Sequence, residues 1–205
     1  MNQAKSSNAF KGFSEYIARS MSFEQYLSLI DDLLEEGKST GPVQSDEHYY
    51  FSRLNRQRIK RLGKTVTVDG ETRSAVLSLT RPLFWLIITE GWCGDAAQGI
   101  PVIEKIAAGS PLITTHYILR DQYPELIGSY LTDGAKSIPK LICLDAETLV
   151  ELGTWGPRPQ KAQQYFVEMR EEGMEKSDIM EQLQRWYLKD GGLEIGKELS
   201  ELLRS

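Results

Sequence analysis

The chain has 205 residues, of which 40% are hydrophobic and 26% are charged, and its formal net charge is −5. A chain of this length can bury a substantial core, and its size favours one α/β domain with helical additions. The mild negative charge disfavours attraction to phosphate backbones and anionic lipid headgroups. We therefore expect neither nucleic acid nor a membrane among its partners.

The lack of a recognisable targeting signal and the small number of cysteines favour a cytoplasmic location. No apolar run approaches the roughly 20 residues of a membrane span, and the amino-terminal stretch MNQAKSSNAFKGF lacks the apolar core of a secretory signal. The two cysteines, Cys93 and Cys143, are too few for a disulfide scaffold. They lie far in the sequence from His48 and His116, so we expect no metal and no cofactor.

The first third of the chain has a helical pattern. The segment Ser22-Phe23-Glu24-Gln25 has the form of a capping box, and apolar residues then recur at helical spacing until Gly37. Residues 38–44 contain Gly41-Pro42 and are predicted to form a loop.

A second helix is predicted from about Asp46 to Leu62. One face is apolar, and Arg58 falls within it, so we expect Arg58 either to reach solvent or to meet a carboxylate. The opposite face is basic, with Arg53, Arg56, Lys60 and Lys64. An anion site is one interpretation of this basic face, but a solvated helix surface is the simpler one.

The hydrophobic period changes at Lys64. Residues 65–68 (TVTV) alternate as in a strand, and Asp69-Gly70 is typical of a turn. Residues 82–89 (PLFWLIIT) form a nearly continuous apolar run, as in a strand that is buried on both faces. The remaining pattern predicts a helix over 94–108, a strand over 113–119, a helix over 123–131, a hairpin of strands 141–144 and 149–154, and helices over 159–170 and 178–188, with a short tail helix.

This order predicts the fold class α/β. Residues 64–172 give β-β-α-β-α-β-β-α, which folds into a mixed central sheet flanked by helices on both faces. We expect residues 1–63 to form an N-terminal helical extension packed on this core. Residues 173–205 are expected to form a C-terminal helical extension.

The predicted reactive residue lies in the segment Glu90-Gly91-Trp92-Cys93-Gly94-Asp95-Ala96. This segment joins the buried strand to the following helix. Cys93 therefore lies at a helix amino terminus, where unpaired N–H groups and the helix dipole favour a thiolate over a thiol. A lowered pKa turns a cysteine into a nucleophile near neutral pH. Cys93 is the predicted reactive residue.

Three elements resemble the thioredoxin family. Trp92-Cys93-Gly94-Asp95-Ala96 resembles its Trp-Cys-Gly-Pro-Cys motif, and Ile138-Pro139 resembles its Ile-Pro element. Gly153 resembles the glycine that the family places beside the substrate groove. The resemblance covers about residues 66–170.

The resemblance implies a thioredoxin-like fold with Pro139 in the cis form against the reactive cysteine. It also implies that Trp92, Gly94, Ile138, Pro139 and Gly153 contact the substrate. With its helical extensions, the chain resembles bacterial thioredoxin-family proteins that carry Trp-Cys-Gly-Asp.

Two departures from the family pattern limit the chemistry. Ala96 stands where thioredoxins have the resolving cysteine, so Cys93 can form a mixed disulfide but cannot discharge it internally. The family also has a buried acid in the strand before the motif, where this chain has only the apolar residues 86–88. The usual proton acceptor is therefore expected to be missing.

The remaining polar groups of the motif allow two interpretations each. Asp95 is either a carboxylate stabilised by the helix dipole or a proton acceptor for Cys93, although its charge also opposes thiolate formation. Glu90 is either a similar proton acceptor or, as we expect, a turn residue that faces solvent. Trp92 either shields the sulfur and lines a groove or simply packs. Cys143 lies too far along a strand from Pro139 to reach Cys93, so it is predicted to be a core residue.

Two functional hypotheses follow. In the first, Cys93 exchanges with protein thiols or disulfides, or removes glutathione from proteins, and an external thiol such as glutathione resolves the intermediate. In the second, the chain is a thioredoxin-fold protein-binding module without turnover. A third possibility, a small-molecule pocket between the helical flanks and the sheet, has no support in the sequence.

Overall fold

The computed structural model describes residues 12–204. Its strands are β1 (Leu83–Thr89), β2 (Ile113–Leu119), β3 (Lys140–Asp145) and β4 (Glu151–Trp155). Its helices are α1 (Phe13–Arg19), α2 (Phe23–Glu35), α3 (Asp46–Thr65), α4 (Gly70–Leu77), α5 (Gly94–Ala107), the 3-10 helix η1 (Arg120–Gln122), α6 (Pro124–Gly128), α7 (Gln160–Glu171), α8 (Lys176–Asp190) and α9 (Leu193–Arg204).

The four strands form one mixed sheet in the order β2-β1-β3-β4. β1 pairs in parallel with β2 and antiparallel with β3, and β3 pairs antiparallel with β4. The four central residues of β1, 85–88, have no exposed surface. This burial explains the apolar run in the sequence, because a strand covered on both faces carries no alternation.

Two sequence predictions about the elements are wrong. No strand forms at 65–68: α3 continues to Thr65, and Asp69, expected to lie in a turn, is the N-cap of α4. The Asp69 carboxylate accepts hydrogen bonds from the Glu71 and Thr72 amides. These N–H groups lie in the first turn of α4 and would otherwise have no partner within the helix. The predicted helix over 123–131 is shorter, since α6 covers only Pro124–Gly128 and the 3-10 helix η1 precedes it. The other predicted helices and strands are confirmed to within a few residues.

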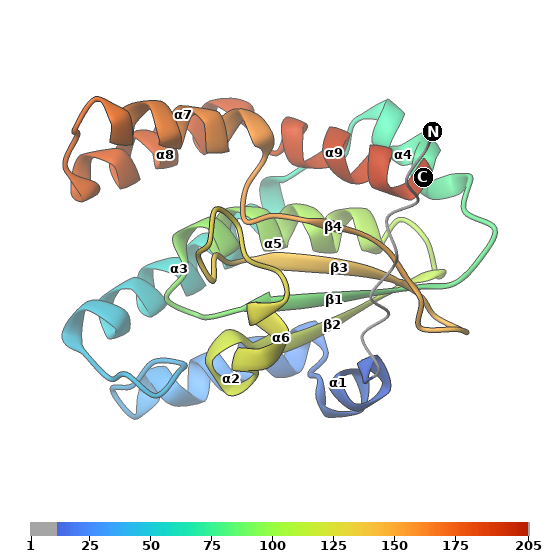
Figure 1. The fold of residues 1–205 in the computed structure, drawn as a ribbon, viewed down its shortest axis with the longest axis horizontal. Coiled ribbons are helices and arrows are strands. Elements are labelled where there is room, and N and C mark those ends of the chain that lie inside the picture. The colour runs from blue at the N-terminus through green and yellow to red at the C-terminus, as the bar shows by residue number, and fades with distance from the viewer. Residues whose placement is uncertain (1–11, 205) are drawn as a thin grey trace.

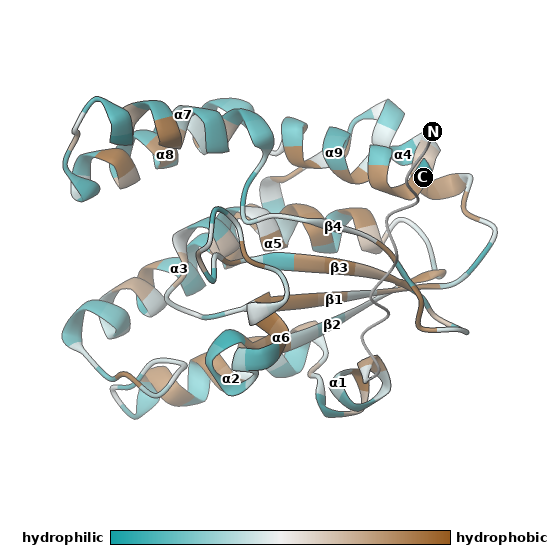
Figure 2. Ribbon diagram, viewed as in Figure 1, coloured by the Kyte–Doolittle hydropathy of each residue, from teal (hydrophilic) through white to brown (hydrophobic). Residues whose placement is uncertain are grey.

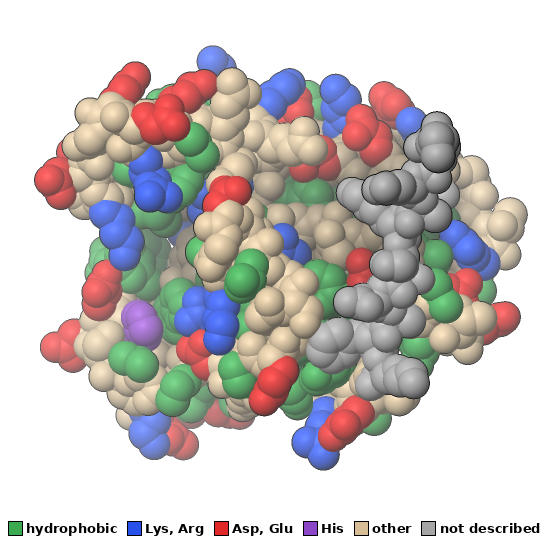
Figure 3. All heavy atoms as spheres, in the orientation of Figure 1, with side chains coloured by type: hydrophobic (Ala, Val, Ile, Leu, Met, Phe, Trp, Pro, Cys, Tyr) green, Lys and Arg blue, Asp and Glu red, His purple; other side chains and the backbone are tan. Residues whose placement is uncertain are grey.

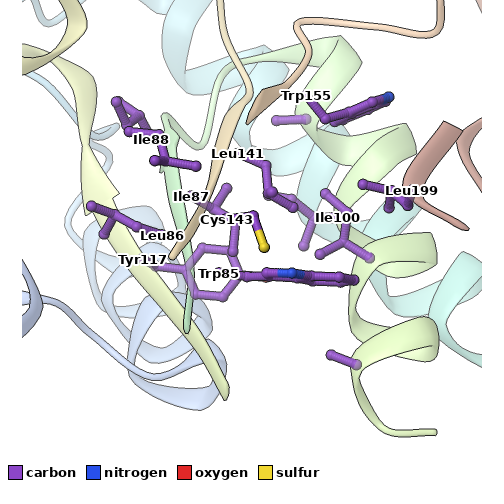
Figure 4. Packing of buried hydrophobic residues seen from close by; sticks show 14 of the residues in the cluster. Trp85, Leu86, Ile87, Ile88, Ile100, Tyr117, Leu141, Cys143, Trp155 and Leu199 are labelled. Atoms are coloured by element: carbon purple, nitrogen blue, oxygen red, sulfur yellow. The ribbon is translucent and has the colours of Figure 1, made fainter. Parts of the chain in front are cut away.

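The helices surround the sheet, as Figure 1 shows: α1 and α2 lie along its β2 edge, and α9 lies beside its β4 edge. The α/β fold class with helices flanking a mixed sheet is confirmed. The central strands are hydrophobic in Figure 2. Figure 4 shows their side chains meeting those of α5 and α9, with Trp85 and Cys143 at the centre.

The helical additions pack in two ways. Helices α1, α2 and α9 contribute Phe13, Tyr26 and Leu199 to the same hydrophobic core as the sheet. Helices α7 and α8 form a hairpin with a small core of its own, built from Ala162, Met169, Ile179 and Leu183, and Tyr187 of α8 also joins the main core. The boundaries at 63/64 and 172/173 stay predictions. No helix within residues 12–204 combines the length and apolarity needed to cross a membrane.

Candidate functional site

The site begins where β1 ends and α5 starts, at the left end of the sheet in Figure 1. Cys93 is the N-cap residue of α5, and its sulfur accepts a hydrogen bond from the Ala96 amide at 3.4 Å. The thiol donates to the Ile138 carbonyl at 3.2 Å. The Ile138–Pro139 peptide bond is cis. Two segments far apart in the sequence are thus brought together around one sulfur.

Helix α8 packs against the residue that follows this cysteine. Only 8% of Cys93 is exposed. The neighbouring Gly94 faces α8 so closely that an added Cβ would lie 3.5 Å from Gln184 Nε2 and 3.8 Å from the Met180 methyl. Gln184 also accepts a hydrogen bond of 2.6 Å from Gln98 on α5. The C-terminal extension therefore closes the start of α5.

Burial changes the acidity of Cys93 in the direction opposite to our expectation. The pKa of Cys93 is raised to about 12, first by desolvation and then by the negative charge of Asp95. Hydrogen bonds from the Ala96 and Asp95 amides and the charge of Arg158 act against this rise. The helix terminus does favour a thiolate, but removing the sulfur from water costs the charged form more. In this closed conformation Cys93 is a thiol.

Asp95 is tied into a buried network and is itself 5% exposed. Its Oδ2 atom accepts from Arg158 Nη2 at 2.5 Å and from Arg158 Nε at 3.1 Å. Its Oδ1 atom accepts from the Tyr187 hydroxyl of α8 at 2.9 Å. Arg158 also donates to Gln163 and lies 4.4 Å from the Phe166 ring centroid. These contacts favour the structural interpretation of Asp95, since both carboxylate oxygens are engaged.

Glu90 is buried, so the prediction that it faces solvent is wrong. It has no exposed surface, and its Oε1 atom accepts from the Asp121 amide at 3.1 Å. Desolvation is the main cause that raises its pKa. A buried acid is therefore present, directly after β1 instead of inside it. The backbone carbonyl of Glu90 accepts a hydrogen bond from the Cys93 amide at 3.1 Å.

Trp92 lies between two polar side chains from other parts of the chain. Its ring stacks on His48 of α3, with centroids 4.7 Å apart and planes inclined by 11°. The Arg120 guanidinium lies 4.7 Å from the ring centroid. In Figure 3 this face of the molecule is hollowed between the α7–α8 hairpin and the start of α3. Trp92 thus joins the N-terminal helices to the motif turn.

Gly153 is not part of the site, so its predicted place beside the groove is wrong. It pairs with Cys143 in the middle of the sheet, and an added Cβ would lie 2.5 Å from Leu202 of α9. Gly156 is the glycine beside the proline loop. It has φ +108°, and a Cβ there would collide with the Pro139 carbonyl oxygen.

The second cysteine is buried in the core, as predicted. Cys143 is 1% exposed, pairs with Trp85 of β1, and has its pKa raised to about 11 by desolvation (Figure 4). Both cysteines are free. Among residues 12–204 no three histidine, cysteine or acidic side chains gather closely enough to hold a metal ion.

A family model described as Thioredoxin matches residues 41–177, which is more than half of the chain and includes the motif, the proline loop and Arg158. The chain belongs to the thioredoxin family. None of the curated proteins matches it.

Two solved structures share the fold of this thioredoxin-family chain. A protein of unknown function from Pseudomonas aeruginosa has a TM-score of 0.66 and 15% identity, and the match covers 94% of this chain and 95% of the other. An HIV epitope scaffold has a TM-score of 0.56 and 16% identity, and that match covers 90% of this chain and 98% of the other. At such identities the likeness concerns the fold alone. It extends over most of the helical additions.

Sequence reasoning about this thioredoxin-family site missed the residues that come from outside the motif. They are Arg158, Tyr187, Gln184 and Gly156. The run Gly156-Pro157-Arg158-Pro159 could have pointed to Arg158, because a charged residue between two prolines has a restricted backbone and therefore a fixed position. No local pattern could have paired α8 with the first turn of α5.

Proposed function

We propose that the protein is a thiol redox protein that uses Cys93 as its single reacting sulfur. The observation that carries this proposal is the position of that sulfur. It caps α5, accepts the Ala96 amide at 3.4 Å, and lies within hydrogen-bond distance of Ile138, beside Pro139. A thiolate formed there would keep the helix N–H groups as partners.

The proposed reaction is thiol–disulfide exchange in two steps. The Cys93 thiolate attacks one sulfur of a glutathionylated protein or another disulfide. A new S–S bond to Cys93 forms, the old S–S bond breaks, and the released thiolate takes a proton from solvent. A low-molecular-weight thiol such as glutathione then attacks the mixed disulfide, becomes oxidised and restores Cys93. An external thiol is required because Ala96 offers no resolving sulfur.

The cover over Cys93 adds a condition to this reaction. A thiol with a pKa of about 12 is almost fully protonated near neutral pH, so the closed form is a poor nucleophile. We infer that the substrate reacts when α8 is displaced from Gly94 and Gln98. Water then reaches the sulfur and lowers the desolvation cost of the thiolate.

The other predicted site residues have defined places in this proposal. Trp92 and the Ile138–Pro139 segment would form the walls that contact a bound substrate, and Gly94 would leave space for it once α8 moves. Asp95 would act mainly through its ion pair with Arg158, which offsets the negative charge beside the sulfur.

A second function is favoured by one observation, the burial of Cys93. A sulfur that stays covered cannot exchange, and the chain would then be a binding module of the thioredoxin fold. Its ligands would be protein segments held near Trp92 and Pro139 without covalent chemistry.

An intact-mass experiment with oxidised glutathione tests the redox function. The wild type should gain one glutathionyl group, Cys143→Ser should gain it at the same rate, and Cys93→Ser should gain none. Added reduced glutathione should remove the group. The redox proposal fails if native wild-type protein gains no adduct, or if the adduct forms on Cys143.

A capture experiment separates the two functions. Partners retained equally by wild type and Cys93→Ser, in complexes that reductant does not dissociate, indicate the binding module. Partners retained only by wild type and released by reductant indicate exchange through Cys93.

A further inference from the structure

A cavity of about 350 Å³ lies between α3, α5, α8 and α9, next to the cysteine site, with which it shares Gln184 and Tyr187. Tyr187 lines it from α8, and its hydroxyl binds Asp95 on the side of the motif. Gln98 and Gln184 also line it and bind each other at 2.6 Å. The volume is within the range of small-molecule sites, which begins at about 300 Å³.

One wall of the cavity is apolar. Val66, Val102 and Ile195 are buried there, and Leu62 continues the wall along α3. Leu188 lines the cavity as well, although 73% of its surface is exposed. A large aliphatic side chain left in water at the mouth of a cavity gains free energy when a hydrocarbon chain covers it.

The charge at the cavity is entirely positive. Arg58 and Arg61 line it, and none of the other lining residues is acidic. Neither arginine forms an ion pair with a carboxylate of residues 12–204. The hydrogen-bond partner of Arg58 is the Asn55 amide oxygen at 2.8 Å, so the expected carboxylate partner is absent from this part of the chain.

The positive charges of Arg58 and Arg61 repel each other. Desolvation and the charge of Arg61 both lower the pKa of Arg58. An anion bound between them would remove this repulsion and form charge-assisted hydrogen bonds, which are about twice as strong as neutral ones. A fully polar anion would leave the apolar wall uncovered, and a neutral hydrocarbon would leave the arginines unpaired.

We propose that this cavity binds a small amphipathic anion, with one carboxylate between Arg58 and Arg61 and an aliphatic chain along Val66, Val102 and Leu188. The site uses neither Cys93 nor thiol chemistry, so it stands whether or not the redox function holds.

Calorimetric titration of the full-length protein tests this assignment with octanoate as the probe. Octanol has the same tail without the charge, and acetate has the charge without the tail. We expect octanoate to bind at one site and both comparison compounds to bind at least about ten-fold more weakly, which corresponds to about 1.4 kcal/mol for each missing part.

Variants locate the site. Arg58→Gln combined with Arg61→Gln should weaken octanoate binding by about ten-fold or more, since both charge-assisted contacts are lost. Arg53→Gln is the matched control, because Arg53 lies on the same helix and is exposed but does not line the cavity. It should leave affinity unchanged. Leu188→Asn should weaken octanoate binding and leave the affinity for acetate unchanged.

The proposal is overturned if octanoate does not bind, if octanol binds equally well, or if the double arginine variant keeps wild-type affinity. Circular dichroism checks that each variant is folded. If the double variant does not fold, Arg61→Gln replaces it, because Arg61 is exposed. The comparison of octanoate with octanol on the wild type needs no variant at all.

Discussion

The Tyr187 hydroxyl donates a hydrogen bond of 2.9 Å to Asp95, which ties α8 to the first turn of α5. Asp95 follows Cys93 by two residues, so this bond holds α8 against the motif turn. The same carboxylate is paired with Arg158. One buried acid therefore connects the motif, the segment after β4 and the C-terminal helices.

Tyr187→Phe should make Cys93 more reactive. The ring still packs, but the hydrogen bond to a charged acceptor is lost, which is worth about 1.5–3 kcal/mol. If the sulfur reacts through displacement of α8, alkylation by iodoacetamide at fixed pH should accelerate about ten-fold or more.

Tyr165→Phe is the control for this variant. It removes a hydroxyl from α7 in the same hairpin, whereas the donors to the Asp95 carboxylate are Arg158 and Tyr187. Its alkylation rate should equal that of the wild type. Equal rates in all three proteins would mean that the Tyr187 hydroxyl does not restrict access to Cys93.

The burial of Cys93 should make stability fall at alkaline pH. The folded pKa of about 12 lies above the unfolded value of about 8.5, so the protonated thiol favours the folded state. This contribution is fully present below about pH 8.5 and is lost as the pH rises toward 12, with a slope of at most about 1.4 kcal/mol per pH unit. Urea unfolding at about pH 8, 9 and 10 measures it.

Comparison with Cys93→Ala isolates the contribution of this one thiol. Lysines and tyrosines titrate in both proteins, so the difference in unfolding free energy reports Cys93 alone. That difference should shrink as the pH rises. A difference that stays constant over the range would show that the folded thiol has an ordinary pKa.

Asp95→Asn should lower the pKa of Cys93 and destabilise the fold. The neighbouring negative charge that helps to raise the pKa is removed, while Arg158 remains as a cation. A buried ion left without its partner costs about 3–5 kcal/mol. The pH dependence of alkylation and urea unfolding measure the two effects.

Replacing both charges provides the matched test of that pair. Asp95→Asn with Arg158→Gln leaves no uncompensated ion, so much of the stability should return. The double variant should lack the large pKa decrease of the single one, because the cation beside the sulfur is gone as well. Identical titration of Cys93 in wild type and both variants would contradict this electrostatic account.

Gly156→Ala should destabilise the proline loop by several kcal/mol. The new methyl group would collide with the Pro139 carbonyl, in addition to the cost of about 1–3 kcal/mol for a left-handed residue. Gly173→Ala is the control, since Gly173 has φ +76° and nothing lies within 4 Å of an added Cβ. Thermal unfolding should separate the two variants. Equal losses of thermal stability in the two variants would mean that the close approach of Gly156 to Pro139 does not contribute to the cost of the substitution.

Local sequence signals predicted most of the elements correctly. The capping box of Ser22 and Gln25 forms as expected at the start of α2, because both partners lie within one helical turn. The apolar run of residues 82–89 became the buried strand β1. The motif turn placed Cys93 at the N-cap of α5, since a strand followed by a helix fixes the position of the residue between them.

The failures have two physical origins. The residues TVTV alternate like a strand, but the Asp69 cap and the continuation of α3 determine their conformation. Glu90 looks like a turn residue, yet packing against Asp121 and loop residue Thr40 buries it. Gly153 resembled a family glycine through its place near the end of the hairpin, whereas in the structure it packs against α9. For Glu90 and Gly153 a distant segment outweighs the local preference, whereas at residues 65–68 two neighbouring helices do.

The sequence by itself determined the strand and helix that meet at Cys93, the absence of a resolving cysteine at position 96, and the proline element at 138–139. Hydrogen bonds within a helix and hydrophobic periodicity act over a few residues, so such features are local. Only the tertiary structure decided the state of the sulfur. Burial and the charge of Asp95 outweigh the helix terminus, because desolvation depends on everything that surrounds an atom, whatever its distance along the chain.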